Sequence, residues 1–213
     1  MNRRVLTAWL AGALLVCAQP ARSQSLGQFG GAAPLPMNSK VISTFVDASS
    51  HEVGFITQLR LSYYPDVDFG FQGGVKRLDY VDNGGNALRL GADFKVAAAR
   101  VRSGFPVDLS FGAGLGVDTG DNLSVLTMGP DAIASRAYPM GGSSVIEPYA
   151  SLGLCYASVN SNLQDDTGIQ WPLRLGAEYR FTQDLRFAME LKQYYGTHFG
   201  DRNGFAIGTT FAF

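Results

Sequence analysis

Hydrophobic and polar residues alternate along most of the chain after residue 39. Apolar side chains recur at every second position, which is the periodicity of a β-strand and not the 3.6-residue period of a helix. Eight segments show the alternation clearly: 52–64, 67–76, 86–96, 107–118, 145–157, 169–181, 185–194 and 204–213. Two weaker segments are 40–46 and a stretch from about 123 to 138 that Pro130 interrupts. The pattern predicts an all-β protein.

The two faces of these strands differ in a way that favours a membrane barrel. Most of the strands are 10–13 residues long, whereas strands of soluble proteins usually have about 5–6 residues and tilted transmembrane strands about 9–11. One face is apolar, and the other carries charged residues and many glycines. An apolar exterior around a polar lumen is the arrangement of a transmembrane β-barrel. A soluble barrel or sandwich with a polar outer face is the main rival.

The connections favour ten strands over eight. Transmembrane barrels alternate short periplasmic turns with longer extracellular loops. Counting back from Phe213, the connections 195–203, 182–184 and 158–168 are long, tight and long. The alternation continues only if 123–138 is a strand, and an eight-strand barrel would require the loss of 40–46 as well. We therefore predict an antiparallel up-and-down transmembrane β-barrel over residues 39–213.

The N-terminal residues 1–23 have the features of a cleaved secretory signal peptide. Arg3 and Arg4 precede an apolar run that is too short to span a membrane, and Ala21 and Ser23 provide small residues before the cleavage point. Cleavage removes Cys17 and leaves Cys155 as the single thiol. Residues 24–38 form a Gly-, Pro- and Ala-rich lead-in that we expect to be flexible. The sequence leaves open whether it lies in the periplasm or enters the lumen.

The composition excludes several classes of protein. Hydrophobic residues make up 46% of the 213 residues and charged residues 16%, which is incompatible with intrinsic disorder. A mean hydropathy of +0.04 is too low for a bundle of membrane helices. The formal net charge of −1 provides no surface for nucleic acid. Removal of Arg3, Arg4 and Arg22 from the 17 bases and 18 acids leaves a mature net charge of −4.

The chain resembles the small outer-membrane β-barrel proteins of Gram-negative bacteria, of the OmpA/OmpX-like type. The signal peptide, the alternating aromatic strands, the tight turn in 179–185 and the terminal Phe213 carry the resemblance. It implies a location in the bacterial outer membrane, outer-membrane lipid as surroundings and a monomer. It also implies that the last strand is read by the outer-membrane assembly machinery, through Phe205, Phe211 and Phe213. Because fold does not determine activity, the resemblance leaves the role open.

Charged side chains on the inner face are the strongest candidates for a lumen site. The barrel is narrow, so unpaired charges inside would carry a desolvation cost of several kcal/mol. We expect a network of salt bridges that closes the lumen, centred on six mid-strand residues: Arg89, Asp93, Arg174, Glu178, Glu190 and Lys192. The predicted role is structural or in surface interactions, and a narrow channel is the alternative.

An enzyme at the extracellular rim is a second alternative. The two histidines, His51 and His198, lie in the first and last outer loops, with Asp47 and Asp201 as candidate orienting carboxylates. Gly200 stands where a lipid-A-deacylase-like His-x-Ser motif would need serine. The adjacent Asp165 and Asp166 are more typical of a solvated loop than of a cation site. We therefore predict no catalytic residue, metal or cofactor.

Overall fold

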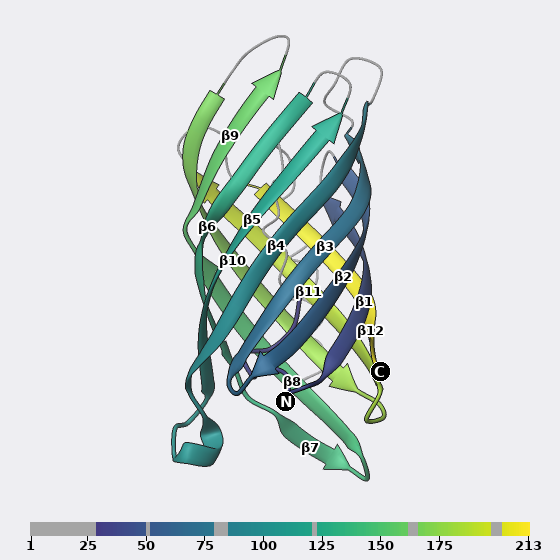
Figure 1. Ribbon diagram of the computed structural model, residues 1–213, viewed down its shortest axis with the longest axis vertical. Helices are drawn as coiled ribbons and strands as arrows, with labels where there is room; N and C mark the ends of the chain where they lie inside the picture. Colours follow the sequence, from purple (N-terminus) through teal and green to yellow (C-terminus); the bar gives the residue numbers. More distant parts are fainter. Residues whose placement is uncertain (1–28, 50–51, 79–84, 121–122, 162–165, 197–201) are drawn as a thin grey trace, which may run out of the picture.

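The computed structural model describes residues 29–49, 52–78, 85–120, 123–161, 166–196 and 202–213 (Figure 1). The predicted signal peptide lies outside the described residues. The elements are β1 (Lys40–Ser49), β2 (Glu52–Tyr64), β3 (Val67–Leu78), β4 (Gly85–Ala99), the 3₁₀ turn η1 (Val101–Ser103), β5 (Asp108–Gly120), β6 (Leu123–Ser135), β7 (Tyr138–Gly141), β8 (Ser144–Gly153), β9 (Cys155–Ser161), β10 (Asp166–Arg180), β11 (Leu185–Gly196) and β12 (Arg202–Ala212).

The strands form one closed antiparallel barrel. Each spanning strand pairs with its neighbours in the sequence, and β1 pairs with β12 from Val41↔Ala212 to Ser49↔Gly204, which closes the sheet. Figure 1 shows the tilted strands winding around the lumen. The barrel has ten spanning strands in up-and-down order, so the predicted fold class is confirmed. The eight-strand alternative is wrong because both weaker segments, as β1 and β6, form full strands.

One spanning strand consists of two segments, β8 and β9, which both pair with β6 on one side and with β10 on the other. The break between them falls at Leu154. The Leu154 N–H donates to the Pro130 carbonyl across 3.0 Å, but Pro130 has no N–H with which to return the bond. Pro172 of β10 similarly lacks a donor next to Gly153, and its Cγ lies 3.0 Å from an ideal Gly153 Cβ position. Pro130 was expected to interrupt its own strand, yet β6 continues through it and the neighbouring strand is broken instead.

The predicted apolar faces point outward. Phe55, Leu90 and Trp171 are each at least half exposed, at 51%, 56% and 51%. The alternate positions are buried in the lumen, as the burial pattern BeBeBiBiB at the start of β2 illustrates. Among the tyrosines, Tyr194 is buried on the inner face. Among the described residues, no helix is long and apolar enough to cross a membrane.

Both ends of the barrel-forming chain lie at the same end of the barrel, here called the terminal end. The Phe213 N–H donates to the Lys40 carbonyl across 3.1 Å. Two turns at this end are tight: one contains Asp66 with φ +64°, and the other spans 181–184. The other two connections are longer, because one contains η1 and the other extends into the β7–β8 hairpin below the wall (Figure 1).

Candidate functional site in the barrel lumen

The lumen is filled with charged side chains that form ion pairs. Every buried lysine or arginine among the described residues lies within 4 Å of a carboxylate oxygen; these bases are Arg60, Lys76, Arg89, Lys95, Arg174 and Lys192. Alternation places them there, since each stands at an inward position of its strand. In a low-dielectric interior such pairing offsets the cost of removing the charges from water.

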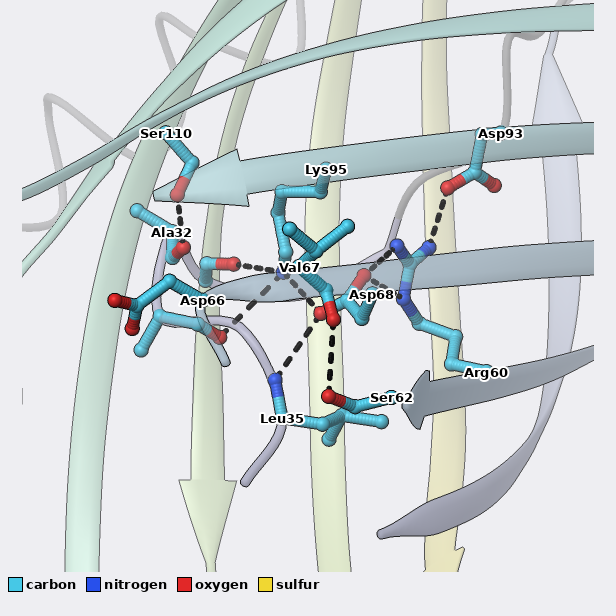
Figure 2. Close-up of polar contacts among 12 residues, drawn as sticks. Ala32, Leu35, Arg60, Ser62, Asp66, Val67, Asp68, Asp93, Lys95 and Ser110 are labelled. Atoms are coloured by element: carbon cyan, nitrogen blue, oxygen red, sulfur yellow. Dashed lines mark hydrogen bonds and ion pairs between the residues drawn. The ribbon is translucent and has the colours of Figure 1, made fainter. Parts of the chain in front are cut away.

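The Arg60 cluster joins β2, β3 and β4. The Arg60 guanidinium lies between two carboxylates: Nη1 donates to Asp93 Oδ1 across 2.7 Å, and Nε donates to Asp68 Oδ1 across 3.1 Å. Lys95 Nζ lies 3.6 Å from Asp68 Oδ2. Figure 2 shows these side chains converging from neighbouring strands. Gly70 makes the convergence possible, because a Cβ there would lie 2.5 Å from Asp93 Oδ2 and 2.7 Å from Arg60 Nη1.

The Lys76 cluster joins β2, β3, β4 and β5. Lys76 Nζ donates to Glu52 Oε1 across 3.2 Å and to Asp118 Oδ2 across 3.4 Å. Arg89 Nη1 donates to both oxygens of the Asp118 carboxylate, at 3.2 Å each. Asp118 is therefore shared by two bases.

The Lys192 cluster lies on β1, β8 and β11. Lys192 Nζ donates to Asp47 Oδ2 across 3.0 Å and lies 3.9 Å from Glu190 Oε1. The Tyr149 hydroxyl donates to the other Glu190 oxygen across 2.9 Å. The contact between Lys192 and Asp47 connects strands at opposite ends of the barrel-forming chain, 145 residues apart in the sequence.

Two further groups complete the polar lining. Arg174 Nη2 donates to Asp131 Oδ2 across 2.5 Å and to Ser151 Oγ across 2.7 Å. Glu178 accepts from Arg186 Nη1 across 3.1 Å, and Arg180 lies 3.7 Å from Glu178 and from Glu147.

All six residues predicted as the network centre therefore lie inside the barrel. Within the six, Lys192 Nζ lies 3.9 Å from Glu190 Oε1, and each of the other four forms an ion pair with a residue outside the six. Two partners outside the six, Asp47 of Lys192 and Asp131 of Arg174, were not predicted as lumen residues because they stand on the strands that were least clear in the pattern. At the terminal end, Asp108 accepts from the Val101 N–H across 2.9 Å.

Residues 29–35 of the predicted lead-in enter the lumen, whereas residues 36–38 are exposed. Phe29 stacks on Phe45 with ring centroids 3.8 Å apart, and Lys192 Nζ lies 4.4 Å from the Phe29 centroid. Gly31, Ala32, Pro34 and Leu35 are buried. The alternative that the sequence left open is thus answered for these residues: they occupy the inside of the barrel. Composition alone contains no signal for this, because Gly-, Pro- and Ala-rich segments have no period that identifies a packing partner.

The wall holds this segment mainly through its backbone (Figure 2). Lys95 Nζ donates to the carbonyls of Gly31 and Ala33, at 2.9 Å and 3.5 Å. Ser110 Oγ donates to the Ala32 carbonyl. In the other direction, the Ala32 N–H donates to Ser135 Oγ across 2.8 Å and the Leu35 N–H donates to Asp68 Oδ2 across 3.1 Å.

One part of the lining is apolar, which the predicted polar lumen did not include. A buried cluster lies on β4, β6 and β9, away from the terminal end: Ala87, Leu123, Val125, Ala157 and Val159. Cys155 follows on the same face of that wall and is buried as a free thiol.

The candidate rim residues are mostly beyond the described part of the chain. His51, His198, Asp201 and Asp165 lie outside the described residues. Asp47 does not stand at the rim, because its carboxylate accepts from Lys192 inside the lumen. Within the described residues, no group of three or more His, Cys, Asp or Glu side chains is arranged to hold a metal ion.

The sequence matches no protein-family model, and no curated protein is significantly similar to it. The chain is similar to several solved structures. The β domain of the Bordetella autotransporter BrkA aligns with a TM-score of 0.52 at 10% identity, over 82% of this chain and 99% of that domain. An outer-membrane channel from Pseudomonas putida F1 aligns with a TM-score of 0.49 at 12% identity, over 88% of this chain and 100% of that one. The N-terminal β-barrel domain of Pseudomonas aeruginosa OprF aligns with a TM-score of 0.43 at 18% identity, over 83% of this chain and 98% of that domain. With ten antiparallel strands, an apolar exterior and a charged interior, this chain has the architecture of the outer-membrane β-barrel proteins.

Proposed function

We propose that the chain is an integral, monomeric protein of the bacterial outer membrane whose lumen is closed, with a structural or surface-interaction role. Residues 1–23 direct export and are removed. The terminal end faces the periplasm. The exposed Phe205, Phe211 and Phe213 of the last strand and its end are the signal for the assembly machinery.

The observation that carries the closed lumen is the occupation of its interior. Ion pairs inside the lumen join strands that are not adjacent in the wall, as Lys192 of β11 with Asp47 of β1 and Arg174 of β10 with Asp131 of β6 illustrate. Residues 29–35 fill further space on the terminal side. A conducting pore needs hydrated groups or a lining of one charge sign. Here both signs are paired and buried, which supports closure.

Planar-bilayer recording tests the closed lumen. The refolded mature chain, residues 24–213, should add no steady conductance to the bilayer beyond that of a detergent blank. Insertion is verified separately by the heat-dependent gel migration typical of folded barrels. Steady unitary openings of inserted protein would contradict closure and would favour the narrow channel.

A non-enzymatic role is part of the proposal. Asp47 was one of the two candidate carboxylates for orienting a rim histidine. Its carboxylate instead accepts a hydrogen bond from Lys192 inside the lumen. Expression of the protein in a Gram-negative host should leave the mass spectrum of lipid A unchanged. A new lipid A species that disappears with His198→Ala would overturn this part.

A further inference from the structure

The lumen contacts of residues 29–35 have the chemistry of a peptide-binding site. The carbonyls of three consecutive residues, Gly31, Ala32 and Ala33, all accept hydrogen bonds from wall side chains. Two N–H groups of the same segment, on Ala32 and Leu35, donate to Ser135 and Asp68. A wall whose side chains hydrogen-bond to backbone N–H and C=O groups in this way can bind an extended polypeptide.

The same wall also selects side chains. Ala32 is fully buried, so its position accepts only a small residue. A Cβ at Gly31 would lie 2.0 Å from Glu147 Oε1, and the Glu147 carboxylate is held in place by Ser135 Oγ at 2.7 Å. Phe29 stacks on Phe45, and Leu35 is buried at the other end. The preferred ligand is therefore an extended segment with an aromatic residue at the position of Phe29 and glycine at that of Gly31. A small residue follows at the position of Ala32, and leucine stands at that of Leu35.

The segment is attached to the barrel without strand pairing. Within 29–39 the described hydrogen bonds between segment backbone and wall backbone occur at one end: the Asn38 N–H donates to the Ser62 carbonyl across 2.7 Å, and the Ser62 N–H donates to the Ser39 carbonyl across 3.1 Å. Residues 29–38 belong to no strand. The segment can thus leave its place while the barrel ladder stays intact.

We propose that the lumen wall around Asp68, Lys95, Ser110, Ser135 and Glu147 is a binding site for an extended polypeptide segment, and that residues 29–35 are its exchangeable intramolecular occupant. The site opens toward the terminal end, and its partner class is a polypeptide with the aromatic–Gly–small–Leu arrangement of residues 29–35. This inference rests on the proposed closed lumen, since the same residues fill it. Tethering gives the internal segment a high effective concentration, so it outcompetes a free peptide in the native chain.

The test uses the full mature chain and a synthetic peptide of residues 29–38, Phe-Gly-Gly-Ala-Ala-Pro-Leu-Pro-Met-Asn, with a fluorophore at its C-terminus. Ala32→Trp should displace the internal segment, because no space surrounds the Ala32 methyl group. Met37→Trp is the matched control, since Met37 is 53% exposed on the same segment. Fluorescence anisotropy should show peptide binding to Ala32→Trp at least 10-fold tighter than to the native chain or to Met37→Trp. A peptide with leucine in place of Gly31 should bind at least 10-fold more weakly.

Equal binding of both peptides to Ala32→Trp, or no binding of the native peptide, would overturn the proposal. If Ala32→Trp does not give the heat-dependent migration of a folded barrel, Phe29→Ala/Leu35→Ala replaces it, because that variant weakens the internal segment without adding bulk. For that variant too, equal binding of both peptides or no binding of the native peptide would overturn the proposal. Conductance of the native chain would contradict the closed lumen but would leave these binding outcomes to be judged separately.

Discussion

At the residue scale, the Arg60 cluster shows why the interior depends on pairing. One guanidinium is shared by two carboxylates from neighbouring strands, and all three side chains are buried. Removing one member of a buried ion pair costs about 3–5 kcal/mol, because the remaining charge has no compensation.

Arg60→Met should therefore destabilise the barrel by about 3–5 kcal/mol, since Asp68 and Asp93 lose their shared partner. Urea-dependent unfolding in phospholipid vesicles measures the change. Arg102→Gln is the control, because Arg102 is highly exposed and should shift stability by no more than about 0.5 kcal/mol. Similar stability of Arg60→Met and Arg102→Gln would show that the cluster contributes nothing.

Glycine provides a second residue-scale test. Gly70→Ala places a methyl group against Asp93 and Arg60, whereas the nearest atom to a Cβ at Gly73 is 3.8 Å away. Gly70→Ala should cost about 1–3 kcal/mol through overpacking, and Gly73→Ala should stay within about 0.5 kcal/mol. The same unfolding assay distinguishes the two. A larger loss from Gly73→Ala would contradict the packing described around Gly70.

At the element scale, the paired prolines weaken one place in the wall. Pro130 and Pro172 flank the junction of β8 and β9 at Leu154, and neither can donate to it. The junction therefore has fewer ladder hydrogen bonds than the adjacent parts of the same strand. Local opening is easiest where such bonds are missing.

Pro130→Ala should slow amide exchange of the segment around Leu154, because the new N–H can complete the bond to β8 and β9. Hydrogen–deuterium exchange followed by mass spectrometry measures the rate in peptides that cover 152–156. Peptides from β2 serve as the internal reference. Unchanged or faster exchange around Leu154 would show that the missing donor does not cause the break.

The elements also show which features were predictable from sequence. Two-residue alternation identified the eight clear strands and their outward faces, because burial of one face leaves a period of two. The positions of Asp47 and Asp131 were missed where alternation is weak. The lumen position of residues 29–35 has no periodic signature, and the partners of Lys192 depend on closure between distant strands. The β8–β9 break also could not be predicted, because its cause lies on the neighbouring strands.

At the scale of the whole molecule, the barrel has its charged residues inside and its apolar residues outside, the reverse of a soluble protein. Charges are paired in the lumen, and the exposed wall is apolar around its circumference, from Phe55 on β2 to Met189 on β11. A surface of this kind is stable in lipid and unfavourable in water. The orientation of the two faces is the central claim, since both the location and the closed lumen depend on it.

Trp171 offers the most direct test of that claim. The chain contains two tryptophans, and Trp9 lies within the predicted signal peptide, so Trp171 is the single tryptophan of residues 24–213. Its side chain is half exposed on the outer face of β10. In vesicles of lipids brominated along their acyl chains, we expect strong quenching of its fluorescence and little quenching by aqueous iodide. Strong iodide quenching with no effect of the brominated lipids would contradict the membrane-spanning account.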